Sequence, residues 1–148
     1  VDKYKNKKEE YYKEGKKHRD GDFPAFVYGN IQEYWKNGQL HRGNDLPAVI
    51  KGSNLEYWKN GQLHRDNDLP AVISVDQYKN KKEEYYKEGK RHRENFKPAV
   101  INHNGSLEFW NDGVNITNII EELINDESLN KDYKKWSGKD KLYIMLKI

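Results

Sequence analysis

The sequence predicts a mainly β protein, an array of antiparallel β-hairpin repeats forming a single elongated twisted sheet with a short α-helical carboxyl-terminal cap. Three observations predict this fold class: a ten-residue motif recurs along the chain, turn-forming dipeptides separate short β-favouring runs, and the apolar spacing becomes helical only near the end. A single hairpin repeat cannot bury its apolar face alone, but stacked neighbours bury it together.

The composition suits such a thin fold and excludes several other classes. Of the 148 residues, 13% are aromatic, which separates the chain from disordered sequences, and the formal net charge is only +3. Without cysteine there is no disulfide framework and no thiolate metal site. Because no apolar run approaches the roughly 20 residues that span a bilayer and no export signal is visible, we expect a cytoplasmic protein, or a host-cytoplasmic one if the chain is viral.

The repeated motif is the strongest signal in the sequence. Its central form, Glu-Tyr-Trp-Lys-Asn-Gly-Gln-Leu-His-Arg, occurs twice without change, two looser copies keep Tyr-Tyr and His-Arg, and a fifth stops before its His-Arg ending. After every His-Arg pair a four-residue gap leads to Pro-Ala and a short β-favouring run. Residues 75–93 match residues 1–19 at all but two positions, which indicates a duplicated two-repeat unit. The five copies, called repeats one to five, begin at Glu10, Glu33, Glu56, Glu84 and Glu108.

Turn and breaker residues delimit the expected strands. The Asn-Gly pairs at 37–38 and 60–61 favour tight turns because both residues tolerate positive φ, and the Pro-Ala pairs fit strand starts because proline cannot donate to a ladder. The Leu-His-Arg segment after each Asn-Gly turn fits either a strand extension or a structured connection. Strands are expected at residues 9–13, 24–28, 31–36, 47–51, 55–59, 70–74, 83–87, 98–102 and 106–110.

The last part of the chain predicts helices. Asn118 followed by Glu121 resembles a capping box, and a second helical stretch over 129–136 is expected to end at Ser137-Gly138. We expect these helices to cover the last sheet edge, since open edges invite aggregation; a partner-binding or membrane-surface helix is the alternative. The expected domains are the hairpin array, residues 1–113, and the helical cap, residues 114–148. The apolar positions on helical faces are Ile116, Ile119, Ile120, Leu123 and Ile124, then Leu129, Tyr133 and Trp136, then Leu142, Met145 and Leu146.

The repeats share an aromatic residue, a Gly three positions later and, except in repeat five, a His three positions after that. They are Tyr12, Gly15 and His18; Trp35, Gly38 and His41; Trp58, Gly61 and His64; Tyr86, Gly89 and His92; and Trp110 with Gly113. This spacing resembles the MORN repeat family, in a divergent variant form seen in uncharacterised proteins of bacteria and of large DNA viruses of amoebae. Glu33 and Arg42 stand where the family has Gly. The resemblance implies a non-enzymatic module that binds proteins or helps to place a partner at membranes.

Adjacent aromatic residues predict an interaction surface. Tyr34 and Trp35 should point to opposite faces of a one-layer sheet, because side chains alternate along a strand. One face could then present an aromatic groove rimmed by charge to an extended peptide or a helix, the alternative being that the rings only stack on one another. The candidate partner-binding residues are Tyr34, Trp35, Tyr57, Trp58, Tyr86, Trp110, Arg42 and Arg65.

The repeated polar residues are interpreted as structural, so no catalytic residue, cofactor or metal ligand is expected. With two strands per repeat, equivalent histidines should lie roughly 10 Å apart, too far to share one metal ion. The repeated arginines could form a phosphate-binding stripe, but each shares its repeat with acidic residues, so no nucleic-acid binding is expected.

The predicted function is a non-enzymatic repeat scaffold that mediates protein–protein interaction through a sheet face, with a partner of unknown identity. The first alternative is a phospholipid-binding or membrane-proximal module with weak contact to anionic lipid. The remaining alternatives are nucleic-acid binding and a small hydrolase in the tail, for which Ser128, Ser137, Asp132 and His103 are the only candidate groups. Edge-to-edge self-association is left open.

Overall fold

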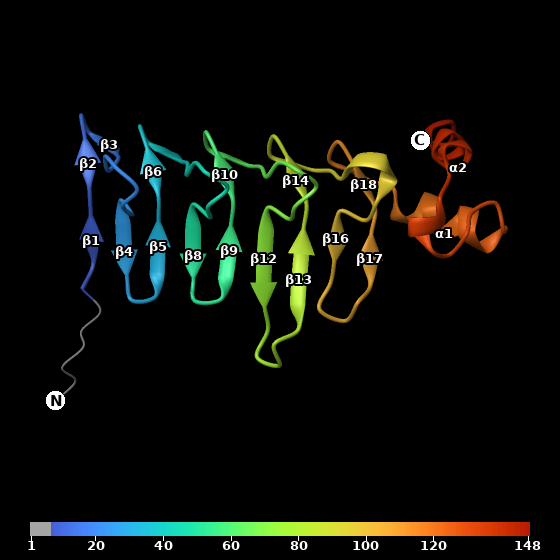
Figure 1. Ribbon diagram of the computed structural model, residues 1–148, viewed down its shortest axis with the longest axis horizontal. Helices are drawn as coiled ribbons and strands as arrows, with labels where there is room; N and C mark the ends of the chain where they lie inside the picture. Colours follow the sequence, from blue (N-terminus) through green and yellow to red (C-terminus); the bar gives the residue numbers. More distant parts are fainter. Residues whose placement is uncertain (1–6) are drawn as a thin grey trace.

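The computed structural model describes residues 7–148, so the first six residues of the expected array lie outside the described part. Its main feature is a nine-stranded antiparallel sheet in the order β1-β4-β5-β8-β9-β12-β13-β16-β17, in which strands consecutive in this order are paired. The sheet is a single elongated layer that ends at the helices (Figure 1). The strands are β1 (Glu9–Glu10), β4 (Phe26–Tyr28), β5 (Ile31–Glu33), β8 (Val49–Lys51), β9 (Asn54–Glu56), β12 (Val72–Val75), β13 (Lys81–Glu84), β16 (Val100–Ile101) and β17 (Leu107–Glu108).

Each repeat also forms a small two-stranded hairpin, which continues from a strand of the long sheet at one end of that strand (Figure 1). These hairpins are β2 (Tyr12–Lys13) with β3 (Lys16–Lys17), β6 (Trp35–Lys36) with β7 (Gln39–Leu40), β10 (Trp58–Lys59) with β11 (Gln62–Leu63), β14 (Tyr86–Lys87) with β15 (Lys90–Arg91), and β18 (Trp110–Asn111) with β19 (Val114–Asn115). At the tip of the second hairpin, Asn37 and Gly38 have φ values of 51° and 81°, as a tight hairpin turn requires. The predicted fold class and Asn-Gly turns are therefore confirmed, and His41 and Arg42 form a connection after β7.

The expected strand at 31–36 is wrong as one continuous element, because a buried tyrosine divides it. Tyr34 separates β5 from β6; its N–H donates to the Ala48 carbonyl at 2.7 Å, and its carbonyl accepts from the His41 N–H at 3.0 Å. The chain changes its pairing partner at this residue, from the neighbouring strand of the sheet to the returning strand of its own hairpin. The strands expected at 9–13, 55–59 and 83–87 are also divided at a tyrosine, and the strand expected at 106–110 is divided at Phe109.

The expected strands that open with Pro-Ala begin two residues later, at Phe26 in the first case and at a valine in the other three. Ala48 precedes β8, yet its N–H donates to the Glu56 carbonyl at 2.9 Å, so the pairing already starts there. This alanine is fully buried, and so are its counterparts Ala25, Ala71 and Ala99. Over residues 7–116 the array has no conventional two-layer core; its buried atoms lie where the long sheet meets the small hairpins.

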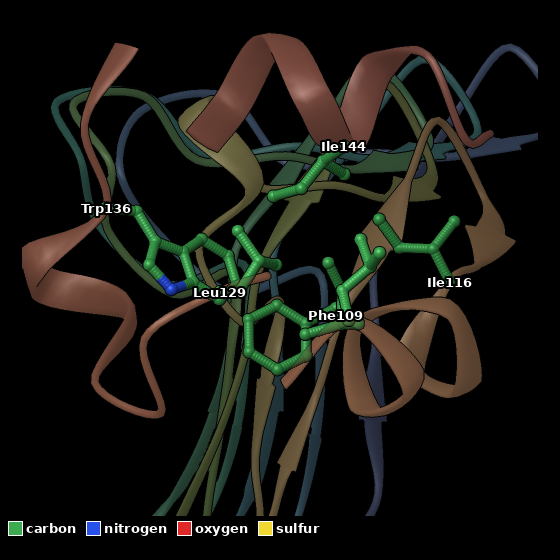
Figure 2. Close-up of a cluster of buried hydrophobic side chains, with 7 residues drawn as sticks. Phe109, Ile116, Leu129, Trp136 and Ile144 are labelled. Carbon is green, nitrogen blue, oxygen red and sulfur yellow. The ribbon is translucent and has the colours of Figure 1, made fainter. Parts of the chain in front are cut away.

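The carboxyl-terminal segment contains α1 (Thr117–Asn125), a 3₁₀ turn at Tyr133–Lys135 and α2 (Gly138–Met145). These elements enclose one apolar cluster, in which Phe109 from the last hairpin stacks on Trp136 at 5.5 Å between ring centroids (Figure 2). Leu107 of β17 packs against the same cluster, so the helices pack on the last hairpin of the array as expected. Of the described residues, none belongs to a helix long and apolar enough to cross a membrane. The cluster consists of Phe109, Ile116, Ile120, Leu123, Leu129, Trp136 and Ile144.

Four expectations for this segment are wrong. The capping box lies at α2, where Ser137 and Asp140 satisfy each other, and not at Asn118, because α1 already begins at Thr117 and Asn118 lies inside it. Ser137 therefore begins a helix where a helix end was expected. The expected helix over 129–136 is only a 3₁₀ turn. The stripe of Leu142, Met145 and Leu146 is exposed, because α2 turns its fully buried Ile144 toward the cluster.

Candidate functional site

One face of the array carries a row of partly buried aromatic rings, called the tryptophan face. In every ring of the row a polar atom donates to the glutamate two residues earlier. Trp58 Nε1 donates to Glu56 at 2.9 Å, for example. Because each ring is tied to its own strand, the row is fixed in orientation. The ring residues are Trp35, Trp58, Tyr86 and Trp110, and their acceptors are Glu33, Glu56, Glu84 and Glu108.

Cations from preceding repeats lie against the first and the last ring of the row. Lys17 Nζ is 4.9 Å from the Trp35 ring centroid, and the Arg91 guanidinium is 4.9 Å from that of Trp110. Within residues 7–148, ring–ring packing is confined to the cap. The alternative that the rings of the row only stack on one another therefore does not hold.

Side chains of the long sheet next to the rings form the rest of the tryptophan face in a regular pattern. Valine and glutamate alternate across it, since Val49 is paired with both Glu33 and Glu56, and Val72 with both Glu56 and Glu84. The glutamates that hold the rings are thus separated by apolar side chains. Sequence reasoning found the rings but missed Lys17, Arg91 and the glutamates; the signal was available, because an acid stands two residues before the ring in repeats two to five.

The opposite face, called the tyrosine face, is covered by arginine. Tyr34 and Tyr57 are each only 8% exposed. The guanidinium carbons of Arg42 and Arg65 lie 3.6 Å above the ring centroids of these two tyrosines. In repeat four, burial raises the pKa of Tyr85 to about 12. The candidate tyrosines thus lie on the face opposite to Trp35 and Trp58, beneath other side chains.

The two candidate arginines are occupied by contacts that join successive repeats. Arg42 donates two hydrogen bonds to Asp22 at 2.7 and 2.8 Å, and Arg65 does the same to Asp45 at 2.7 and 2.9 Å. Each also donates to the proline carbonyl of its own repeat. The hydrogen bonds from Arg42 and Arg65 lower the pKa of Asp22 and of Asp45 below the ordinary aspartate value. These arginines therefore tie repeats together and do not form a free cationic stripe.

The repeated histidines also join successive repeats, and each of them contacts the repeat that follows it. In each case Nδ1 accepts from the backbone N–H at the turn of the next hairpin. His64 Nδ1 accepts from the Glu88 N–H at 3.1 Å, while its Nε2 lies 2.9 Å from Asp66 Oδ1. An accepting Nδ1 carries no proton, so the proton of the neutral ring is on Nε2 and is donated to the aspartate. Among the described residues no group of His, Asp or Glu is arranged to hold a metal ion. The four turn contacts are Asn37 to His18, Asn60 to His41, Glu88 to His64 and Asp112 to His92.

Replacing His64 with Ala tests this structural role. The change leaves the Glu88 N–H without its acceptor, so we expect the free energy of unfolding to fall by about 1–3 kcal/mol in urea denaturation. The matched control is His103→Ala, because His103 is exposed in the turn between β16 and β17, and it should change stability by less than about 0.5 kcal/mol. Equal effects of the two changes would contradict the assigned contact.

Hollows lie between the loops of neighbouring repeats. A space of about 360 Å³ separates the loops of repeats one and two, and spaces of about 180 Å³ follow at the next two junctions. The first is lined by Arg42 and Asp22, whose charges already pair with each other. The hollows therefore repeat with the array, and each is lined by an arginine–aspartate pair that joins the two repeats.

The candidate hydrolase groups of the tail serve local structure. Ser137 caps α2 through Asp140, and Asp132 accepts from the Lys134 N–H at 3.1 Å. The turn between β16 and β17, which contains His103, lies away from the helices (Figure 1). Ser128 is exposed after α1. These four residues therefore do not form a triad-like arrangement.

No protein-family model, no curated protein and no solved structure matches the chain. The geometry alone defines its class: antiparallel hairpins follow one another in a single long sheet, with two short helices at the carboxyl-terminal end.

Proposed function

We propose that the chain is a non-enzymatic, MORN-like repeat scaffold that binds a protein partner across the tryptophan face. The observation that carries this proposal is the row of partly buried rings, one in each of repeats two to five and each held in orientation by a glutamate. Tryptophan and tyrosine dominate the binding energy of protein interfaces because they bury large areas and lose little conformational entropy. A regularly spaced row suits an extended peptide or a helix lying along the array.

The MORN-like classification is supported by what the motif residues do. Trp35 opens the hairpin; Gly38, at a φ of 81°, donates its N–H to the Lys17 carbonyl of the preceding repeat at 2.9 Å; and His41 accepts from the turn of the next. The aromatic–Gly–His spacing thus provides a tight turn and two contacts between repeats. These are the requirements of a stacked hairpin array.

The charges of the tryptophan face favour a protein over an anionic membrane. Its cations are paired with its glutamates, Lys51 with Glu56 and Arg91 with Glu84, so the face has no excess of positive charge to attract lipid headgroups. A partner with apolar side chains and charges of both signs is complementary to such a surface.

The test compares two double variants that remove partly buried apolar side chains from opposite faces. Trp35→Ala with Trp58→Ala changes the tryptophan face; Ile50→Ala with Ile73→Ala changes the tyrosine face, where Ile50 is paired with Gln32, the acceptor of the Tyr34 hydroxyl. A partner captured from an extract of the natural source should bind the tryptophan variant at least tenfold more weakly, which is about 1.4 kcal/mol, and bind the isoleucine variant unchanged.

Circular dichroism melting shows whether each variant is folded at the assay temperature, and the single change Trp58→Ala replaces the pair if the pair unfolds. Retained binding by the folded tryptophan variant would overturn the proposal. Binding of the chain to anionic vesicles that disappears at high salt would instead support the lipid alternative, because salt screens exposed charge.

A further inference from the structure

The rings of the tryptophan face are equally spaced along the array. The longer step between repeats three and four does not disturb this order, because its additional residues lie between Val72 and Glu84, in the longer hairpin of β12 and β13 (Figure 1). Each ring is therefore two strands away from the next. The glutamates that hold the rings and the valines between them form one paired row, in the order Glu33, Val49, Glu56, Val72, Glu84, Val100 and Glu108.

The distance between strands sets the spacing of the rings. Neighbouring strands lie about 4.7–4.9 Å apart, so rings two strands apart are separated by about 9.4–9.8 Å. The strands of the long sheet lie side by side in one elongated row (Figure 1). A ligand that runs along this row therefore meets an aromatic ring at a constant interval, from Trp35 to Trp110.

Among the regular peptide conformations, polyproline II has the repeat that matches this interval. Its three residues per turn rise about 3.1 Å each, so every third side chain lies on the same side, about 9.3 Å further along. Side chains on one face of a β-strand recur at about 6.4–6.8 Å, and one heptad of an α-helix advances about 10.5 Å. Over the three intervals of the row the mismatch is about 0.3–1.5 Å for polyproline II and about 2–3 Å for the helix.

The gaps between the rings are apolar in the middle of the row. Leu40 lies directly opposite Trp35 in its hairpin, and Leu63 has the same position in the next hairpin. In the first and fourth hairpins this position holds Lys17 and Arg91, each 4.9 Å from the ring of the following repeat. The centre of the face is thus a tract of alternating rings and leucines with a cation at each end. The tract consists of Trp35, Leu40, Trp58, Leu63 and Tyr86.

The glutamates beside this tract are engaged within the chain. One carboxylate oxygen of Glu56 accepts from its ring, and the other pairs with Lys51. In the same way, the two oxygens of Glu84 pair with Lys82 and Arg91. A ligand that brings neither charges nor N–H groups is complementary to such a surface. Proline has no backbone N–H, and proline-rich segments dock on aromatic-lined surfaces because their conformation is already formed.

We propose that the tryptophan face binds a proline-rich segment of a partner protein in the polyproline II conformation, with every third residue of the segment meeting one ring. A segment of about ten residues reaches all four rings. The inference rests on the proposed function, because it names the class of partner for the same face.

The test uses fluorescein-labelled peptides of defined period, titrated with the full chain and followed by anisotropy. The probe is Leu-Pro-Pro repeated four times, and we expect it to bind saturably and at least tenfold more tightly than two such units, because the longer peptide meets all four rings. Leu-Gly-Gly repeated four times keeps the period but is not preorganised, so it should bind at least tenfold more weakly. Leu-Pro repeated six times keeps the conformation but not the period, and should bind at least fivefold more weakly.

Two double variants place the same added charge on opposite faces of the two middle hairpins. Leu40→Lys with Leu63→Lys should weaken binding of the four-unit probe at least tenfold, because a cation at this position lies over the ring of the next repeat and must be displaced. Gln39→Lys with Gln62→Lys changes the adjacent position, which faces the other way, and should leave binding unchanged. Both variants should fold, as circular dichroism can verify, because hairpins one and four carry lysine or arginine at these positions.

Three results would overturn the inference. They are the absence of saturable binding by the four-unit probe, equal binding of the Leu-Gly-Gly peptide, and equal binding of the probe to the Leu40→Lys, Leu63→Lys variant. Tighter binding of an amphipathic helical peptide than of the probe would assign the face to a helix instead.

Failure of the inference is distinguishable from failure of the proposed function. If the probe does not bind but a captured partner still depends on Trp35 and Trp58, the scaffold function stands and only the polyproline assignment falls. If the probe does not bind and the partner also binds the folded tryptophan variant unchanged, both are overturned.

Discussion

Tyr57→Ala is expected to lower the free energy of unfolding by about 3–5 kcal/mol, one of the two largest effects we predict. The side chain is 8% exposed and lies beneath the Arg65 guanidinium at 3.6 Å. Its removal leaves a cavity at the point where the chain passes from the long sheet to the small hairpin, and it takes away the surface on which Arg65 is positioned. Urea denaturation followed by circular dichroism measures the loss.

The adjacent residue provides the control. Trp58 is larger, but it is partly exposed on the opposite face, so Trp58→Ala should cost only about 1–2 kcal/mol. A larger loss for Trp58→Ala than for Tyr57→Ala would mean that the tryptophan face, and not the tyrosine face, holds the repeats together. It would also weaken the proposal that the tryptophan row is kept for a partner.

Trp136→Ala is expected to unfold the cap at a cost of about 3–5 kcal/mol while the central hairpins stay folded. The ring is 6% exposed, stacks on Phe109, and donates from Nε1 to the Asn130 carbonyl at 2.7 Å. Because each repeat contacts mainly its neighbours, the damage should stay near the carboxyl-terminal end. Hydrogen exchange should show lost protection in α1 and α2 and retained protection in β8 and β9.

Leu146→Ala is the matched change in the cap. Leu146 is 76% exposed, so its replacement should change stability by less than about 0.5 kcal/mol. The Trp136 variant should also aggregate more readily, because loss of the cap uncovers the edge of the last hairpin. Protection lost uniformly over the whole sheet would show instead that cap and array unfold as one unit.

Local signals predicted much of the fold. The Asn37-Gly38 turn followed from residues that tolerate positive φ, and the hairpin class followed from the recurrence of such turns. The break at Tyr34 could not be predicted, because it depends on a change of pairing partner. The start of α1 was missed for a similar reason: Thr117 is engaged by Phe109, a residue of the last hairpin.

The sequence also predicted only part of the candidate site. Alternation along a strand correctly placed Trp35 and Tyr34 on opposite faces, as their hydrogen bonds to Glu33 and Gln32 show. It did not predict that Arg42 would be occupied, because its partner Asp22 lies twenty residues away in the preceding repeat. The sequence suggested that each arginine is balanced by acids of its own repeat. In the structure Arg42 pairs instead with an aspartate of the preceding repeat.

The amino-acid sequence by itself determined the period of the array, its turns and the order of side chains along each strand, because these depend on interactions among residues a few positions apart. Only the tertiary structure decided which of the repeated groups are already satisfied. That outcome depends on which groups the neighbouring repeat supplies at each junction: Arg42 pairs with Asp22, and Arg65 pairs with Asp45, each in the preceding repeat.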